Sequence, residues 1–349
     1  MRTTSPIALL LLLLAACMPA EVTPNSKGVF AYRTEKAIVL TRLADKPEKT
    51  LPIADGPPVS LAWSPDDVRL AFTCLRKNDR QSLGILDTAT GAIQWVATYH
   101  GFIYLPRWSP DGGSISYVVQ PEGGEDSKPT ELHLFRLKDK SNRILVRDCG
   151  ISHAWSPDGG RIVATVSDAT DAMRKKLALG ALVEIVADSG KTYRHLAILW
   201  AQFVHVRYVR DDVIAFCAPR AQLPSQDLDP DEFSYGLFTF HTVRKSLVAV
   251  SKKGESVTYS ADSPSGKRTL FVVSPKGQQL QGELYVTGAG VGKRRRVGET
   301  GHSIFPFWID EDRIGFHNGG KKGKTFSYDL RTGKTTDISA SLEGILIFD

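Results

Sequence analysis

A short turn motif recurs along the chain and limits the folds that the chain can adopt. The motif reads W-S-P-D-D at Trp63–Asp67 and W-S-P-D-G-G at Trp108–Gly113 and Trp155–Gly160. More divergent copies, each starting with an aromatic residue, begin at Tyr208, Tyr259 and Trp308. The aromatic residues therefore recur every 45 to 53 residues. Pro, Asp and Gly are the residues that tight turns require, so each copy predicts a turn between two antiparallel strands.

A second turn signal follows in several repeats. It reads D-T-A-T-G at Asp87–Gly91 and D-L-R-T-G at Asp329–Gly333. Each repeat thus contains four short strands, and one such sheet cannot bury both of its faces unless neighbouring sheets stack on it. The pattern predicts an all-β fold, a β-propeller of four-stranded antiparallel blades. An ordinary β-sandwich with similar turns is the alternative.

The two ends of the chain are expected to close the ring. Three strand-like segments, Gly28–Tyr32, Ala37–Leu40 and Thr50–Ile53, precede the first repeat turn and look like a blade that lacks its first strand. An apolar segment, Gly344–Asp349, follows the last complete repeat. Pairing of these N- and C-terminal strands would give seven blades and remove exposed strand edges. Without that pairing the count is six, and we favour seven.

The repeats resemble those of TolB-like β-propellers, which are relatives of the WD-repeat family. The resemblance rests on the aromatic–S-P-D-G turn followed by an apolar strand, and it covers about Val59 to Ile338. It implies a propeller fold and a binding role, and it assigns no catalytic residue. The chain shows no convincing match to the N-terminal α/β domain of TolB.

The first residues have the pattern of a signal peptide. Arg2 precedes an apolar run, Ile7–Leu14, that is too short to span a membrane stably. The sequence Leu14-Ala15-Ala16-Cys17 resembles a bacterial lipobox, which implies cleavage before Cys17 and acylation of its thiol. A plain secretory leader with an incidental Cys is the alternative.

This pattern divides the chain into a lipoprotein signal peptide at 1–16, a lipidated tether at 17–27 and a single propeller domain at 28–349. Acyl chains on Cys17 would anchor the domain to a membrane. We therefore expect a protein of the bacterial cell envelope, with the outer membrane and periplasm favoured. Nucleic acid is not expected as a partner of an exported lipoprotein.

The net charge of the chain is +6, and its densest cationic run is Lys293–Arg296. Such a run could attract anionic lipid or an acidic partner. Charged residues also protect the outer edges of β-sheets, and we prefer this second interpretation.

Length variation between the repeats is concentrated on one face of the predicted ring. The long segments follow second strands and are Gln120–Thr130, Asp168–Leu179, Ala218–Phe233 and His317–Lys324. Variable loops on a rigid scaffold are typical of binding surfaces, so this face is the expected site. The candidate binding residues lie in the segments between blades on the same face, and are His100, Tyr104, Arg107, His153, His302 and Phe305.

The histidines near first strands raise the possibility of a metal site. They are His100, His153, His205 and His302. Propeller lyases that act on pectin fragments, which also resemble TolB repeats, hold a metal with channel histidines. The four histidines lie at different distances from their aromatic residues, so we expect that they cannot converge on one ion. The sequence predicts no metal and no other cofactor.

No motif in the sequence assembles a catalytic centre. A G-x-S-x-G nucleophile turn is absent, and Gly319–Thr325 is one residue too short for a phosphate loop. We therefore expect a membrane-anchored, non-enzymatic propeller that binds a protein partner or a cell-envelope polymer through its loop-rich face. The alternative is a metal-dependent enzyme similar to polysaccharide lyases, which would use the channel histidines.

Overall fold

The computed structural model describes residues 23–25, 28–42, 49–78, 80–122, 129–167, 179–199, 205–219, 235–252, 254–263, 267–274, 282–288, 294–297, 304–317 and 324–339. These residues contain 27 β-strands and no α-helix. This part of the chain accordingly has no helix that is long and apolar enough to cross a membrane. The predicted all-β class is confirmed.

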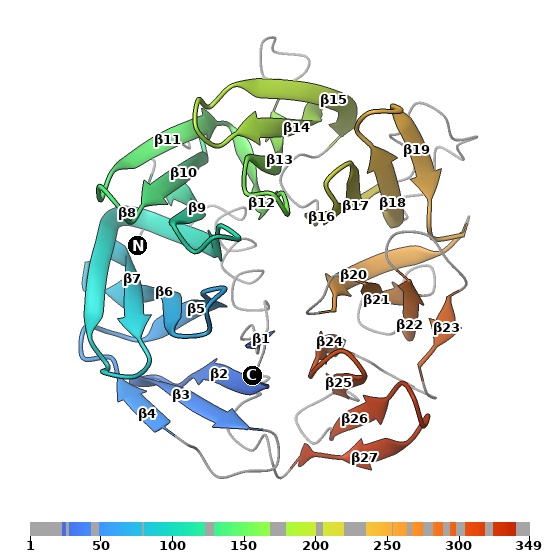
Figure 1. Ribbon diagram of the computed structural model, residues 1–349, viewed down its shortest axis with the longest axis horizontal. Coiled ribbons are helices and arrows are strands. Elements are labelled where there is room, and N and C mark those ends of the chain that lie inside the picture. Colours follow the sequence, from blue (N-terminus) through green and yellow to red (C-terminus); the bar gives the residue numbers. More distant parts are fainter. Residues whose placement is uncertain are drawn as a thin grey trace, which may run out of the picture.

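The strands pair with their neighbours in chain order, and the sheets are arranged as a ring (Figure 1). The first sheet contains β1 (Thr23–Pro24), β2 (Val29–Arg33), β3 (Ala37–Arg42) and β4 (Lys49–Pro52). A seven-stranded sheet follows, with β5 (Pro58–Trp63), β6 (Arg69–Arg76), β7 (Arg80–Asp87), β8 (Ile93–Trp108), β9 (Ser114–Pro121), β10 (Glu131–Arg136) and β11 (Asn142–Arg147).

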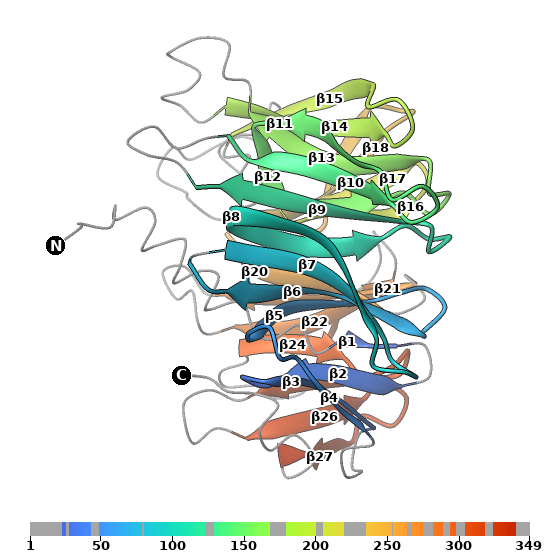
Figure 2. The same ribbon diagram turned by 90° about the vertical axis from the view of Figure 1, so that its left-hand side faces the viewer.

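Four more four-stranded sheets complete the described structure. The first of them contains β12 (Cys149–Trp155), β13 (Arg161–Ser167), β14 (Leu179–Val186) and β15 (Thr192–Leu199). The second contains β16 (Val206–Arg210), β17 (Val213–Pro219), β18 (Tyr235–His241) and β19 (Ser246–Ala249). The third sheet contains β20 (Ser256–Asp262), β21 (Arg268–Ser274), β22 (Glu283–Gly288) and β23 (Arg295–Arg296). The fourth contains β24 (Ile304–Trp308), β25 (Arg313–His317), β26 (Thr325–Asp329) and β27 (Thr335–Asp337). Figure 2 shows the strands running across the ring from one face to the other.

The long strand β8 belongs to two consecutive four-stranded units. Its first half, up to His100, pairs with β7, and its second half, from Gly101, pairs with β9. Counting β8 in both arrangements gives seven four-stranded units in the part of the chain that the structure describes. We number these units 1 to 7 along the chain and call the first strand of each unit, which lies nearest the ring axis, its inner strand (Figure 1).

The first unit differs from the expectation at its inner edge. We expected the C-terminal segment Gly344–Asp349 to pair there, but β1 occupies this position, with Thr23 opposite Ala31 and Pro24 opposite Phe30. These two residues fall in the range that was expected to be tether. The segment 344–349 lies outside the described residues, so its role in closing the ring, and the blade count that includes it, stay predictions.

The repeat turn is closed by a small set of hydrogen bonds. Ser109 Oγ donates to Asp111 Oδ1 at 2.5 Å and accepts from Ser114 N at 2.9 Å. Asp111 Oδ1 also accepts from Gly113 N at 2.9 Å, and Gly112 takes a positive φ of 69°. Ser156–Arg161 repeats the arrangement. The Ser and Asp of the motif therefore satisfy backbone groups of the turn, and the Gly takes the positive φ that Asp67 adopts in the first copy.

The Trp of the motif links each unit to the one before it. Trp108 Nε1 donates to Ala62 O at 3.0 Å, Trp155 Nε1 to Arg107 O at 3.2 Å, and Trp308 Nε1 to Ala261 O at 3.2 Å. Each acceptor lies on the preceding inner strand; Ala62 and Arg107 stand one residue before the aromatic residue of their repeat, and Ala261 stands two residues after Tyr259. The motif thus stabilises both the turn and the contact between neighbouring units.

Removing one of these links should have a modest, measurable effect. We expect Trp155→Phe to lower the free energy of unfolding by about 1–2 kcal/mol, because it removes the bond to the Arg107 carbonyl and part of a packed ring. Urea unfolding measures the change. Tyr193→Phe, at a side chain that is 45% exposed, is the control and should change stability by less than about 0.5 kcal/mol. Equal stabilities of wild type and Trp155→Phe would contradict the proposed link.

The core consists of seven apolar clusters, one between each pair of neighbouring units. For example, Val163 and Leu182 of unit 4 pack against Phe216 and Phe238 of unit 5. The seventh cluster joins the first and last units through Phe30, Tyr32 and Val39 on one side and Ile309 and Ile338 on the other. Phe30 also meets Phe307 edge to face, with ring centroids 6.4 Å apart. Side-chain packing therefore joins the two ends of the ring.

Candidate functional site

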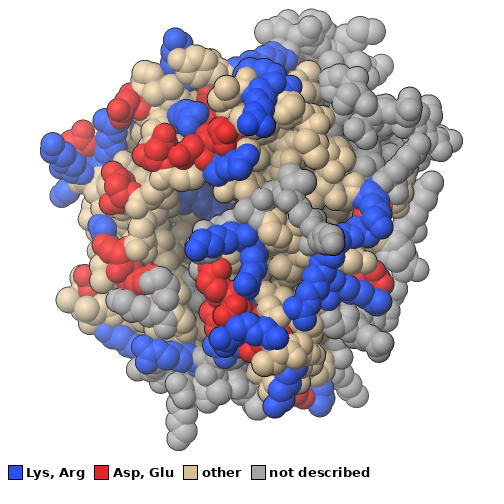
Figure 3. All heavy atoms as spheres, turned by 45° about the vertical axis from the view of Figure 1, so that its right-hand side comes forward, with Lys and Arg blue, Asp and Glu red and all other residues tan. Residues whose placement is uncertain are grey.

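Several inner strands contain irregularities in their pairing with the second strand of the same unit. Register shifts interrupt the pairing of β5 between Pro58 and Leu61, of β8 between Tyr104 and Arg107, and of β12 between Cys149 and His153. The inner strands β16, β20 and β24 carry similar shifts. Bulges of this kind re-aim side chains and are common beside functional sites. Figure 3 shows that the centre of the ring is hollowed, with Lys and Arg atoms at its rim and within it.

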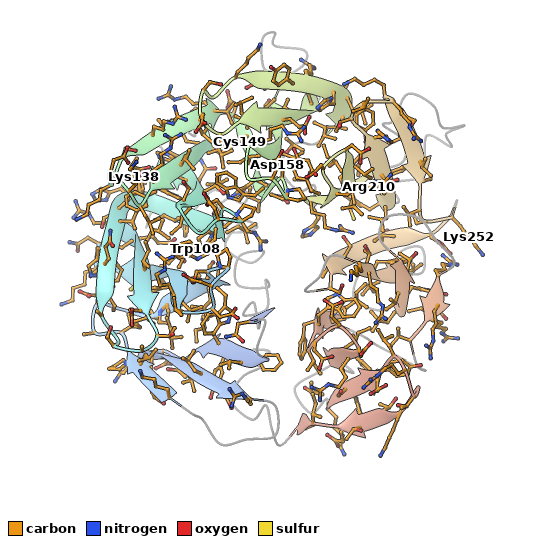
Figure 4. The ribbon with its side chains drawn as sticks, viewed as in Figure 1. Trp108, Lys138, Cys149, Asp158, Arg210 and Lys252 are labelled. Carbon is orange, nitrogen blue, oxygen red and sulfur yellow. The ribbon has the colours of Figure 1, made fainter. Side chains whose placement is uncertain are left out.

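Four basic side chains lie on three consecutive inner strands or directly before one of them. Arg107 and Arg207 each stand one residue before the aromatic residue of their repeat, His153 stands two before, and His205 three before, just ahead of β16. Equivalent positions of the repeats lie at the same height in the ring, so Arg107 and Arg207 share one height, while His153 and His205 lie one and two residues away from it along their strands. We call Arg107, His205 and Arg207 the basic wall. Figure 4 shows Trp108 and Asp158 toward the centre of the same units and Lys138 at the outer edge.

Burial is the largest influence on the titration of the histidine in the basic wall, and the two guanidinium groups act in the same direction. The surrounding protein, Arg207 and Arg107 together lower the pKa of His205 to about 4. This imidazole is partly open to solvent, so its low pKa reflects the nearby cations as well as desolvation. Arg207 Nη1 donates to Ser260 Oγ of unit 6 at 2.9 Å, which fixes the orientation of this guanidinium. The wall therefore carries positive charge from its arginines while its histidine is neutral at pH 7.

His153 is enclosed between units 3 and 4. Its side chain is buried, and its Nε2 lies 2.9 Å from Ser116 Oγ. A Ser–His contact of this length is the spacing of a nucleophile and its base. Ser116 is fully buried, however, so a substrate carbonyl cannot reach its oxygen in this arrangement. The pair serves the packing of unit 3 against unit 4.

Burial and the neighbouring Arg107 lower the pKa of His153 to about 4, below its ordinary value of 6.5. As the pH falls below 6.5 the unfolded chain binds a proton that the folded protein does not, so the stability from this group is complete above 6.5 and is lost toward pH 4. We expect the unfolding free energy of wild type relative to His153→Gln to fall by about 3 kcal/mol between pH 7 and pH 4. Chemical unfolding at both pH values measures it. A difference that does not change with pH would contradict the shift.

The other sequence-predicted residues are not gathered at one point. His100 lies at the joint in β8, where its Nε2 accepts a hydrogen bond from Arg80 Nε at 2.9 Å. Tyr104 stacks on Phe102, with ring centroids 6.1 Å apart, and burial raises its pKa to about 12. Phe305 belongs to β24, but its side chain and the whole of His302 lie outside the description. The binding role of these residues stays a prediction.

The described residues contain no group of three or more His, Cys, Asp or Glu side chains placed to hold a metal ion. Within this part of the chain, His100 is bonded to Arg80 and His153 to Ser116. These two histidines therefore do not converge on one point, as a lyase-like metal site would require.

Sequence reasoning missed Arg207 as a site residue and considered His205 only as a metal ligand. A signal was present: Arg precedes the aromatic residue in both R-W at Arg107–Trp108 and R-Y at Arg207–Tyr208. Comparing repeats by their distance from the aromatic residue would have placed the two arginines at one level of the ring.

The described arginines of the cationic run near residue 295 are engaged in contacts within unit 6 and with unit 7. Arg294 Nη1 lies 2.6 Å from Glu255 Oε2, and Arg296 Nη2 lies 3.0 Å from Glu283 Oε1. Arg295 Nη1 donates to Leu330 O at 2.6 Å. The run lies on and beside the outer strand β23, as the edge-protection interpretation predicted.

A buried carboxylate links units 4 and 5, away from the basic wall. Glu184 accepts from Arg161 Nη1 at 3.0 Å, from His195 Nε2 at 2.5 Å and from Tyr208 OH at 2.5 Å. Lys245 Nζ lies 2.9 Å from the other ring nitrogen of His195. Burial acts to raise the pKa of Glu184, but the bonds from His195, Tyr208 and Arg161 outweigh it and lower the pKa. The sequence pattern gave no indication of this cluster.

Comparison with known proteins defines the fold further. No protein-family model matches the chain. The chain superposes on TolB from Acinetobacter baumannii over 78% of its length and 63% of that chain, with 16% identity and a TM-score of 0.52. It also superposes on the β-propeller domain of the Trilobed protease from Pyrococcus furiosus over 92% of its length and 96% of that chain, with 12% identity and a TM-score of 0.62. The chain has a TolB-like β-propeller fold.

Other similarities are to enzymes. A 115-residue stretch, 30% of this chain, is 30% identical to the Bacillus subtilis (strain 168) protein named uncharacterized peptidase YuxL, of which it covers 16%. A prolyl endopeptidase superposes on 96% of the TolB-like chain with 14% identity and a TM-score of 0.65, and the chain spans 55% of it. An oligogalacturonate lyase in complex with manganese superposes on 90% of the chain and over 85% of its own length, with 14% identity and a TM-score of 0.59.

These findings correct the functional expectation. We expected a non-enzymatic binding propeller and judged an enzyme the weaker alternative. The sequence match to a peptidase contradicts that expectation and points to an enzyme. The expectation of a non-enzymatic protein rested on the absence of a catalytic motif, and this absence does not exclude an enzyme.

Proposed function

We propose that this chain belongs to a peptide-hydrolysing enzyme and that its TolB-like propeller receives the peptide at the centre of the ring. The basic wall is the observation that carries the proposal, because Arg107 and Arg207 stand at equivalent positions of the inner strands of units 3 and 5. The hollow at the centre of the ring, with Lys and Arg atoms within it, supports the same reading (Figure 3). The peptidase relative supports the reaction class.

The inner strands offer a second means of holding a peptide. In the described sheets each inner strand except that of unit 3 is the end strand of its sheet, so one of its edges faces the axis without a strand partner. Unpaired backbone groups at a sheet edge can bind an extended peptide through main-chain hydrogen bonds. The bulges in these strands interrupt that edge at intervals, which favours a short peptide over a long added strand.

We assign to the propeller the binding and orientation of the peptide, and not the bond-breaking step. The Ser116–His153 pair has a suitable spacing for covalent catalysis but is enclosed. Hydrolysis adds water across the amide and releases a carboxylate and an amine. The propeller contributes by holding the substrate in a defined geometry, which lowers the entropy that the reaction must lose.

Peptide binding and turnover by the full-length protein test the proposal. A set of unstructured peptides of 5 to about 15 residues would be incubated with the protein. Fluorescence anisotropy measures binding and mass spectrometry detects cleavage products. We expect saturable binding and new peptide ends. A protein that neither binds nor cleaves any of the peptides would overturn the proposal.

We further propose that the protein is held at the cell envelope by lipid on Cys17, as the lipobox resemblance implies. Mass spectrometry of the N-terminal peptide is expected to find Cys17 as an acylated first residue, and Cys17→Ser should move the protein from the membrane fraction to the soluble fraction. Two or three acyl chains bind a bilayer far more tightly than one, so the shift should be nearly complete. An unmodified Cys17 in membrane-bound protein would contradict this.

A further inference from the structure

We infer that the protein docks on the membrane through one face of its ring, by contact of that face with anionic lipid headgroups. This face is the loop-rich face, on which the second strands end. The opposite face, which carries the S-P-D-G turns, is called the turn face. The inference rests on the proposed lipid at Cys17 and adds the surface of the protein that meets the bilayer.

The first argument is the direction in which the chain enters the ring. β1 and β2 are antiparallel, and the turn between them is closed by Gly28 N, which donates to Asn25 O at 3.1 Å. This turn occupies the place of the S-P-D-G turns in the other units, so it lies on the turn face, and β2 runs from it to the loop-rich face. Because β1 runs the opposite way, the chain enters β1 from the loop-rich face.

The second argument is the length of chain between the lipid and the ring. Cys17 precedes Thr23 by six residues. Because a strand rises about 3.3 Å per residue, a chain of this length spans about 20 Å at most. Thr23 lies opposite Ala31, two residues before β2 ends, so about 7 Å of that length is used within the ring. The acylated residue then stands no more than about 13 Å beyond the loop-rich face, which holds this face close to the bilayer.

The third argument is an exposed apolar side chain beside lysines on the loop-rich face of units 1 and 2, which are neighbours in the ring (Figure 1). Leu75 lies at the end of β6 and is 41% exposed. Lys77 lies in the connection from β6 to β7 and Lys36 in the connection from β2 to β3, and both are exposed. Neither ammonium group forms an ion pair with a described residue. We call Lys36, Leu75 and Lys77 the loop-face patch.

The fourth argument is the balance of charge around the loop-face patch. Residues 33–36 read R-T-E-K and residues 75–80 read L-R-K-N-D-R, which gives five cationic and two acidic side chains. Asp55 pairs with Arg76 and adds a third acid. This part of the face therefore keeps an excess of two positive charges. Such an excess attracts anionic headgroups, while an exposed leucine enters the apolar layer beneath them.

The lipidated full-length protein, reconstituted into vesicles of phosphatidylcholine and phosphatidylglycerol, tests which face meets the membrane. A fluorophore is attached to Glu35→Cys on the loop-rich face or to Ala89→Cys on the turn face, both at exposed positions. Cys74, Cys149 and Cys217 are buried and do not compete for the label. A nitroxide on the lipid headgroup quenches only a fluorophore close to it. We expect the probe at position 35 to lose most of its emission and the probe at position 89 to keep most of it.

Paired lysine variants test the loop-face patch itself. In the soluble Cys17→Ser protein, Lys36→Gln combined with Lys77→Gln should weaken binding to the same vesicles about 30-fold, roughly 5-fold for each lysine. Lys138→Gln combined with Lys140→Gln, at exposed lysines on the turn face, removes the same charge and should leave binding unchanged. The effect of Lys36 and Lys77 should shrink as salt is raised, whereas that of Leu75→Ser should persist. The unfolding midpoint of each variant shows whether it has kept its fold.

The outcomes separate the inference from the proposed lipid anchor, since mass spectrometry shows independently whether Cys17 carries lipid. Lipidated protein in which both probes are quenched equally, or the probe at position 89 more strongly, overturns the inference and leaves the anchor standing. Equal vesicle binding by the two lysine double variants also overturns it. So does quenching at position 35 that requires a second envelope protein, because the patch would then bind protein. An unmodified Cys17 overturns the anchor and the inference together.

Discussion

Glu184→Ala is expected to lower the free energy of unfolding by about 3–5 kcal/mol, because it leaves Arg161 without its buried carboxylate partner. The side chain of Glu184 is only 5% exposed and accepts three hydrogen bonds, from β13, β15 and β16. Two of these donors belong to unit 4 and one, Tyr208, to unit 5. The substitution therefore weakens a unit and the interface beside it at the same time.

Two controls isolate the buried charge. Tyr208→Phe removes one hydrogen bond to the carboxylate and should cost about 1.5–3 kcal/mol. Glu283→Gln removes a pair with Arg296 in which the side chains are 43% and 51% exposed, and should cost less than about 1 kcal/mol. Urea unfolding of the three variants gives the order. A Glu184→Ala protein as stable as Glu283→Gln would show that the cluster contributes no more than a surface pair.

Gly101→Ala is expected to destabilise the protein by at least about 3 kcal/mol. Gly101 has a φ of 120°, which side-chain-bearing residues rarely adopt, and a Cβ there would lie 2.2 Å from Gln120 O and 2.7 Å from Glu122 N. Both of these are backbone atoms of the neighbouring segment and cannot rotate away. Because Gly101 is the first residue of β8 that pairs with β9, the clash falls at the joint between units 2 and 3.

Gly91→Ala provides the matched control for Gly101→Ala. Gly91 also has a positive φ, of 79°, but a Cβ there would meet only Leu51 Cδ2 at 3.5 Å, an ordinary contact. The control should cost about 1–2 kcal/mol from the backbone conformation alone. Thermal or urea unfolding compares the two. Equal losses would mean that the strand can shift at the joint without separating units 2 and 3.

The sequence was most informative where the structure depends on local chemistry. The S-P-D-G turns could be predicted because Ser109, Asp111 and Gly112 act within a few residues of one another. The inner strand β1 could not, since Thr23 and Pro24 show no apolar alternation and their place in the sheet is set by their pairing with β2. A polar segment of this kind is indistinguishable from a tether until its partner strand is known.

The candidate site was only partly predictable for a related reason. Arg107 was expected in a segment between blades and lies on the inner strand β8. His153, which was expected at the channel, is enclosed by Ser116 of another unit. The Glu184 cluster depends on residues up to 61 positions apart, Glu184 and Lys245 being joined through His195. These residues are brought together by the packing of one unit against the next, and the sequence of a single repeat does not show which residues will meet. For function, the absence of a catalytic motif was weaker evidence than the sequence match to a peptidase.

The interface between the first and last units responds to temperature differently from the interface at Glu184. Phe30, Tyr32, Val39, Ile309 and Ile338 hold it by apolar contact. Hydrophobic attraction weakens on cooling, whereas ionic hydrogen bonds such as those of Glu184 do not share this dependence. Units 1 and 7 are also neighbours in the ring that are not consecutive in the sequence, so no short loop connects them. Cold would therefore loosen the ring where its chain begins and ends before it affects the opposite side.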